Sequence, residues 1–129
     1  MTGVAALVGG IVVFLRGRSK TYPAIPVAKA GEIPVGGSKI FTYPSDIEPC
    51  ILLRPAEETY VAFSRTCTHA SCPVHFQSDA NRLICPCHQG AFSAADGSVL
   101  YGPPPTPLPR ILLERRGDNI FATGVVKSS

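Results

Sequence analysis

The sequence predicts an all-β fold, a small antiparallel sandwich or barrel, and three observations support this prediction. The 129 residues include 12 glycines and 13 prolines, and this many helix breakers leaves no room for long helices. Short apolar runs alternate with turn signals at close intervals, as in small antiparallel β domains. The length allows one domain and no more.

The expected strands follow one another from about residue 30 to the C-terminus. A polar loop around Glu57-Glu58 separates two of them, and turns at 78–81 and 117–119 form two hairpins. The predicted strands are Ile33–Val35, Lys39–Thr42, Cys50–Arg54, Tyr60–Ser64, Val74–Gln77, Arg82–Cys85, Ser98–Tyr101, Arg110–Arg115 and Ile120–Thr123.

An apolar segment precedes these strands. Residues 2–15 carry no charge, and Arg16, Arg18 and Lys20 follow them. A helix of this length spans about 21 Å, whereas the hydrocarbon core of a bilayer is roughly 30 Å thick. We favour a short apolar helix over 1–16 that is a membrane-anchor segment, the second half of a longer transmembrane helix. The alternative is an apolar helix packed on the domain or on a partner.

Residues 17–37 are rich in proline and glycine, and we expect them to form a flexible neck without regular structure. The folded domain is expected over residues 30–126. The net charge of +3 is small and no stripe of lysine and arginine is present, so we expect no nucleic-acid partner.

Two short segments hold the residues that carry chemistry. The first reads CTHASC and contains Cys67, His69 and Cys72; the second reads CPCH and contains Cys85, Cys87 and His88. Three interpretations are open. Two thiolates and two imidazoles bind one zinc ion, or the four cysteines form two plain disulfides, or Cys67 and Cys85 hold one iron of a [2Fe–2S] cluster while His69 and His88 hold the other.

Only the iron–sulfur interpretation uses every residue of the pattern. Two thiolates and two neutral imidazoles leave an oxidised [2Fe–2S] site with no net charge, so it accepts an electron more readily than a site with four thiolates. Centres of this type have potentials of about −150 to +300 mV, against about −400 mV for plant-type ferredoxins. An imidazole on Fe(III) also loses its second proton more easily, which couples electron uptake to proton uptake.

These motifs, together with the segment Gly102–Pro104, resemble the Rieske iron–sulfur family, and within it the Rieske subunits of cytochrome bc-type complexes. The resemblance covers about residues 30 to 126 and implies a Rieske-type sandwich or barrel with a cluster-binding subdomain. It implies one [2Fe–2S] cluster and a disulfide between Cys72 and Cys87. Rieske ferredoxins and oxygenase domains lack this second cysteine in each loop.

The resemblance also implies the function and its residues. An electron and a coupled proton come from a quinol, and the electron passes to a cytochrome c-type acceptor, beside a cytochrome b-type subunit in a membrane. His88 is the expected quinol contact, with His69 beside it on the exposed tip. A stiff proline loop that lacks N–H donors is expected to shield the cluster, and its residues are Gly102, Pro103, Pro104 and Pro105.

The sequence departs from high-potential relatives at two positions. Those proteins carry serine two residues after the second histidine ligand and tyrosine two residues later, where this chain has Gly90 and Phe92. Loss of hydrogen-bond donors to sulfur lowers the potential. We therefore expect a potential in the lower part of the Rieske range, matched to a low-potential quinol such as menaquinol.

A disulfide persists only in an oxidising compartment, so we expect the domain on the periplasmic or outer side of a bacterial membrane. Two related functions are alternatives: the small Rieske subunit of a periplasmic oxidoreductase such as arsenite oxidase, and a ferredoxin-like carrier. Two further residues receive structural interpretations. Cys50 is expected to be a small buried apolar residue at a strand start, and His75 a residue that binds no metal.

Overall fold

A computed structural model describes residues 22–69, 71–87 and 89–127 of the chain. The expected apolar helix and anchor over 1–16 and the predicted ligand His88 lie outside these residues. Within the described part of the chain, no helix has the length and apolar character needed to cross a bilayer.

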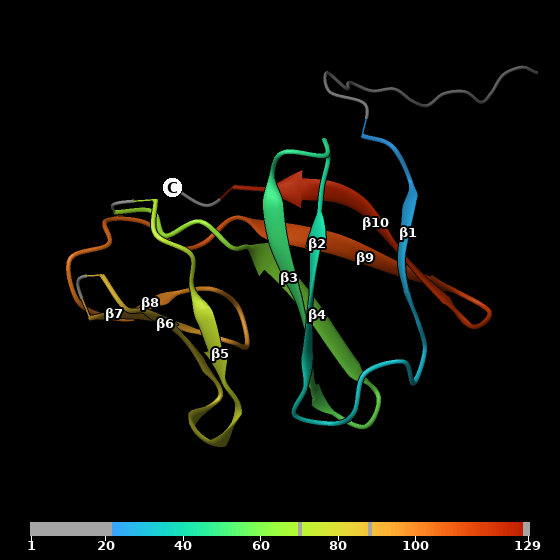
Figure 1. The fold of residues 1–129 in the computed structure, drawn as a ribbon, viewed down its shortest axis with the longest axis horizontal. Helices are drawn as coiled ribbons and strands as arrows, with labels where there is room; N and C mark the ends of the chain where they lie inside the picture. The colour runs from blue at the N-terminus through green and yellow to red at the C-terminus, as the bar shows by residue number, and fades with distance from the viewer. Residues whose placement is uncertain (1–21, 70, 88, 128–129) are drawn as a thin grey trace, which may run out of the picture.

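The described residues form ten strands in two antiparallel sheets (Figure 1). The large sheet has the strand order β1-β10-β9-β4-β3-β2 and is nearly closed, like a barrel. The small sheet has the order β5-β6-β7-β8 and is inserted between β4 and β9 of the large one. The strands are β1 (Ile25–Lys29), β2 (Ser38–Thr42), β3 (Pro49–Ala56), β4 (Thr59–Ser64), β5 (His75–Gln77), β6 (Arg82–Cys85), β7 (Gly90–Ser93), β8 (Val99–Tyr101), β9 (Arg110–Arg116) and β10 (Asn119–Val126).

Strands β3 and β4 lie between two hydrophobic cores. Ile51 and Leu53 of β3 belong to the core shared with the small sheet, whereas Cys50 and Leu52, which alternate with them, belong to the core of the barrel-like sheet. Successive side chains of a strand point to opposite faces. A strand buried on both faces is therefore apolar without alternation, and this explains the runs CILL and YVAF.

The small sheet brings three connections to one edge. The first residue of β5 pairs with β6 just before its end, the end of β6 pairs with the start of β7, and the start of β7 pairs with the end of β8. The loop that enters β5, the loop from β6 to β7 and the loop that leaves β8 therefore meet at the same edge. The residue pairs are His75↔Ile84, Cys85↔Gly90 and Ala91↔Tyr101.

The sequence-based prediction of an all-β fold is confirmed, and so are most of the strands and the turn at Glu57-Glu58. Two predictions are wrong. Residues 33–35 form no strand, although Ile33 is buried. The predicted neck over 17–37 is not irregular from Ile25 onward, because β1 pairs with β10 and buries Val27 and Ala28.

Strand β7, which follows the CPCH segment after Gln89, was not among the predicted strands. Its sequence, GAFS, has no alternation of apolar and polar residues, because Gly90, Ala91 and Phe92 are all buried. A strand buried on both faces gives no period-2 signal.

Candidate metal centre

The first ligand loop joins β4 to β5 and folds into a tight turn. The Cys67 N–H donates to the Cys72 carbonyl at 2.8 Å, and the Ser71 N–H donates to the Cys67 carbonyl at 3.0 Å. Ser71 has a positive φ of 61°. The turn directs the two predicted ligands to different surroundings: Cys67 is buried with 2% of its surface exposed, whereas His69 is exposed.

Arg65 closes the base of this loop. Its carbonyl accepts from the Val74 N–H at 2.9 Å, and its Nε donates to the Val74 carbonyl at 3.0 Å. Its Nη2 lies 3.4 Å from Nδ1 of His75, which is exposed at the start of β5. No local sequence pattern marks Arg65, because its bonding partners are nine and ten residues away along the chain.

The second ligand loop joins β6 to β7. Cys85 is the last residue of β6 and is fully buried, and Gly90 begins β7. Gln89, between them, has a positive φ of 57°. Cys85 and Cys67 belong to the same apolar core cluster.

A disulfide connects the two ligand loops. Cys72 and Cys87 are bonded, with their Cα atoms 6.3 Å apart, as the resemblance implied. The closed loop spans 15 residues of sequence separation and includes β5 and β6. The disulfide therefore connects the first ligand loop to the second directly above the small sheet.

The proline loop, which begins at Gly102, contacts both ligand loops. The hydroxyl of Thr68 in the first loop donates to the Thr106 carbonyl at 2.7 Å. Pro104 is buried, and its ring carbons lie against Gly90 at the end of the second loop. The structure thus brings the proline loop together with both ligand loops, as its predicted shielding role requires.

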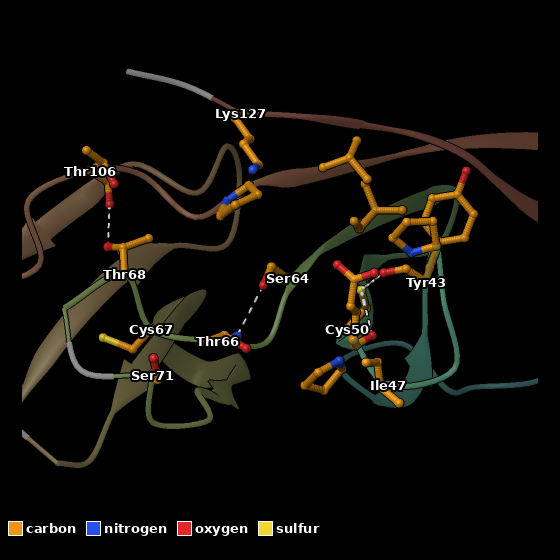
Figure 2. A pocket seen from close by; sticks show the side chains of 16 residues that line it. Tyr43, Ile47, Cys50, Ser64, Thr66, Cys67, Thr68, Ser71, Thr106 and Lys127 are labelled. Carbon is orange, nitrogen blue, oxygen red and sulfur yellow. Dashed lines mark hydrogen bonds between the residues drawn. The ribbon is translucent and has the colours of Figure 1, made fainter. Parts of the chain in front are cut away.

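A groove of about 650 Å³ runs beside the first ligand loop (Figure 2). The first ligand loop and Thr106 form one side, and the start of β3 and the end of β4 form the other. Cys50 lies on the β3 side, and its thiol is 3.4 Å from the Tyr43 carbonyl. Burial raises the pKa of the Cys50 thiol to about 12, and the nearby Glu48 carboxylate adds to this effect. The interpretation of Cys50 as a small buried residue is confirmed.

The donor groups suit a [2Fe–2S] cluster with mixed ligands. Two buried cysteines, Cys67 and Cys85, supply soft sulfur donors inside an apolar core, and the exposed His69 supplies an imidazole on the loop above. Among residues 22–69, 71–87 and 89–127, no three His, Cys, Asp or Glu side chains converge on a single metal ion. In the predicted set the thiolates and the imidazoles belong to different irons, and its fourth member is His88.

Comparison with known proteins identifies the family. Residues 23–112 match the family model of the Rieske [2Fe-2S] domain. The chain belongs to the Rieske family. It carries one Rieske-type [2Fe–2S] cluster and is an electron-transfer protein. The alternatives of a zinc site and of two plain disulfides are thereby set aside.

The relatives of this Rieske protein serve in different assemblies. It is 35% identical over 102 residues to the cytochrome b6-f complex iron-sulfur subunit of Chlorobaculum thiosulfatiphilum, a match that covers 79% of this chain and 54% of the relative. It is 32% identical over 138 residues to iodate reductase subunit IdrB of Denitromonas iodatirespirans, covering 97% of this chain and 75% of the relative. This Rieske protein thus spans little more than half of the b6-f subunit.

A solved structure shows the same fold. The soluble domain of Rieske protein II (soxF) from Sulfolobus acidocaldarius aligns with a TM-score of 0.74 at 23% identity, and the alignment covers 84% of this chain and 82% of that domain. The predicted Rieske-type sandwich or barrel with its cluster-binding subdomain is therefore confirmed for this Rieske protein.

Proposed function

We propose that this chain is the electron-transfer Rieske subunit of a membrane quinol-oxidising complex of the cytochrome bc or b6f type. It accepts an electron and a coupled proton from a quinol and passes the electron to a cytochrome c-type acceptor. The observation that carries the proposal is the exposed imidazole of His69 on a loop tied by the Cys72–Cys87 disulfide. The match to a cytochrome b6-f subunit supports it.

The proposed ligands divide into a buried pair and a surface pair. Cys67 and Cys85 hold one iron from within the apolar core, where little water reaches their sulfurs. His69 and His88 hold the other iron. When bound, the cluster supplies a one-electron couple whose potential is higher than that of an all-cysteine site.

The surroundings of the ligands determine what the site contacts. His69 is exposed, so it lies where a second molecule can approach the tip. His88 is the proposed hydrogen-bond partner of the quinol, with His69 beside it. The proline loop shields the cluster from the side, because it is bonded to Thr68 and packed on Gly90. Quinol contact is thus confined to the imidazole edge.

The absence of hydroxyls at two positions favours a low-potential donor. Gly90 has no side chain, and Phe92 is fully buried in the core beneath the ligand loops. Neither residue supplies a side-chain donor to the cluster sulfurs. We therefore propose menaquinol as the quinol.

We further propose that residues 1–16 anchor the protein and that the domain lies on the periplasmic or outer side of a bacterial membrane. The disulfide supports this side, since it requires an oxidising compartment. Because β1 begins at Ile25, the connection between the anchor and the domain is shorter than the sequence suggested.

One second candidate has specific support. The match to the iodate reductase subunit covers 97% of this chain and 75% of that protein, more of both than the b6-f match. In this alternative the chain is the small Rieske subunit of a periplasmic oxidoreductase, its cluster takes electrons from a large molybdenum subunit, and no quinol contacts His88. The disulfide argues against the third alternative, a ferredoxin-like carrier, because such proteins lack the second cysteine of each loop.

The decisive experiment is purification of the full chain with its native partners, followed by electron paramagnetic resonance of the cluster. We expect haem b to co-purify and a menaquinol analogue to reduce the cluster within the complex. A molybdenum-containing subunit in place of haem b, with a cluster that no quinol reduces, would overturn the proposal in favour of the second candidate. The His88→Ala and His75→Ala variants form a matched pair, since only the first should abolish reduction by quinol.

A further inference from the structure

Gly90, which begins β7, contacts the proline loop without any space for a side chain. A methyl group placed on Gly90 with ideal geometry would lie 2.8 Å from both Cδ and Cγ of Pro104. Carbon atoms in favourable contact are about 3.5–4.0 Å apart. The proline ring is rigid, and Pro104 is buried, so the ring cannot rotate away from such a group. The contact is therefore compatible with glycine alone unless the loop moves.

Gly102, which follows β8, also lies too close to Gly90 to carry a side chain. Ala91 pairs with Tyr101, the last residue of β8, and Gly90 and Gly102 are the residues that flank this pair on the side of the ligand loops. Gly102 has a φ of +95°, and a methyl group on it would lie 2.5 Å from the Gly90 Cα. The two backbones thus approach closely where the second ligand loop ends and the proline loop begins.

A hydrogen bond holds the far end of the proline loop. The Thr68 hydroxyl of the first ligand loop donates to the Thr106 carbonyl at 2.7 Å. The loop is consequently fastened twice: by packing on Gly90 from the second ligand loop and by the Thr68 bond from the first. Displacing Pro104 would therefore disturb the loop between two fixed points.

We propose that Gly90 is a positioning residue that seats the proline loop over the cluster, and that this packing excludes a side-chain donor at residue 90. The inference rests on the proposed ligand set and on the shielding role of the proline loop. It adds a physical reason for the missing hydroxyl. A serine at residue 90 would have to displace Pro104, so a hydroxyl there conflicts with a closed loop.

The consequence is a dependence between residues 90 and 104. Gly90→Ser alone should open the loop and expose the cluster to solvent. Gly90→Ser combined with Pro104→Ala removes the ring carbons that collide with the new side chain. In that double variant the loop closes again, and the hydroxyl then lies where it affects the cluster.

The test uses the full-length holoprotein and two readouts. The first is the rate at which an iron chelator bleaches the visible absorption, and the second is the midpoint potential from a titration followed by paramagnetic resonance. We expect Gly90→Ala and Gly90→Ser to accelerate bleaching at least tenfold. Adding Pro104→Ala should reverse most of that acceleration, and the G90S/P104A variant should have a higher midpoint potential than G90A/P104A.

Pro103→Ala is the matched control, because Pro103 is an exposed proline of the same loop. It should not slow bleaching when combined with Gly90→Ser. The inference is overturned if the Gly90→Ser variant bleaches as slowly as the wild type. It is also overturned if adding Pro104→Ala to Gly90→Ser slows bleaching no more than adding Pro103→Ala does. Neither readout involves a quinol or a partner, so failure here leaves the proposed complex untouched, while a wild-type protein without a cluster would contradict the proposed function instead.

Discussion

The cysteine residues of this protein occupy three chemically different environments. Cys67 and Cys85 lie in the apolar core under the ligand loops, Cys72 and Cys87 form the disulfide above it, and Cys50 lies at the start of β3. The sequence motifs predicted this division of the five cysteines. The structure shows the disulfide and the buried Cys50 thiol, and it buries the two cysteines that are proposed as ligands.

Cys50 provides a test at high pH. Its pKa is raised from 9.0 to about 12 by burial, and its thiol stays protonated in the folded state when the unfolded chain has already released the proton. Stability from this residue is complete below pH 9 and is lost as the pH rises from 9 toward 12, by at most about 1.4 kcal/mol per pH unit. We expect the thermal midpoint of the wild type to fall more steeply than that of Cys50→Ala over this range. If the thermal midpoints of the wild type and of Cys50→Ala fall in parallel with pH, the raised pKa of Cys50 is contradicted.

Substitution of the three histidines should have different effects on the paramagnetic signal and on the iron content. His69→Ala and His88→Ala each remove a proposed ligand, so we expect the Rieske paramagnetic signal and the bound iron to be lost. His75→Ala removes an exposed ring that contacts Arg65. In this variant the paramagnetic signal and the bound iron should both remain. Iron analysis and resonance of the dithionite-reduced proteins measure this directly, and a normal signal from His69→Ala would refute the ligand assignment.

Phe92 offers a way to shift the potential within an intact core. The wild-type midpoint is expected in the lower part of the Rieske range, below about +250 mV. Phe92→Tyr adds one hydroxyl at a fully buried position under the ligand loops, and a new donor to sulfur should raise the potential. Phe76→Tyr, at a partly buried position of the same core, is the control and should leave the potential unchanged. A larger rise in midpoint potential for Phe76→Tyr than for Phe92→Tyr would contradict this expectation.

At the scale of secondary structure, the small sheet is a support for loops. Its strands have only three or four residues each. Four short strands with few ladder bonds do not hold long loops rigidly by themselves. The disulfide, the Arg65 bonds at the loop base and the Thr68–Thr106 bond add the restraints that the ladder lacks.

Removal of the disulfide should therefore affect the cluster as well as stability. Closing a loop of about 15 residues contributes about 3 kcal/mol in the chain-entropy model, and the separation of Cys72 and Cys87 is 15. We expect Cys72→Ala/Cys87→Ala to lower the thermal midpoint and to bleach faster in chelator. Cys50→Ala, which removes a buried thiol outside both ligand loops, should not bleach faster. Equal bleaching of wild type and double variant would show that the disulfide does not restrain the ligand loops.

At the scale of the whole molecule, the barrel-like sheet and the small sheet share a core through β3 and β4. The first ligand loop leaves this shared core directly from the end of β4, and the second loop joins two strands of the small sheet (Figure 1). Side chains of both sheets pack in the core that the two sheets share. The two sheets are therefore expected to unfold together.

The corrected boundary of the domain predicts the effect of truncation. A chain that begins at Tyr22 keeps β1, the buried Val27 and the hydrogen bond from the Tyr43 hydroxyl to the Pro23 carbonyl at 2.6 Å. A chain that begins at Gly31 loses all three and exposes the edge of β10. We expect only the first to fold with a full complement of iron, measured by circular dichroism and iron content. Equal iron content in the two truncated chains would show that β1 is not needed for folding and would favour the predicted neck over 17–37.

The sequence by itself determined the chemistry and the class of fold. The proposed ligands are recognised by their residue types and by their close spacing in the sequence. CTHASC and CPCH each place a cysteine and a histidine within a single loop. Most strands were predictable because their ends are marked by turn residues. The two exceptions have opposite causes: β1 is a strand despite its proline, because β10 pairs with it, and β7 has no alternation, because both of its faces are buried.

The tertiary structure alone decided how the loops are held. The approach of Gly90 to Pro104, the Arg65 bonds to Val74 and the Thr68 bond to Thr106 join residues 9 to 38 positions apart. No local pattern records such contacts, because they depend on strand order and on the depth at which each loop packs. Residue types specify which atoms bind the cluster, whereas the packing of distant segments determines how firmly that cluster is covered.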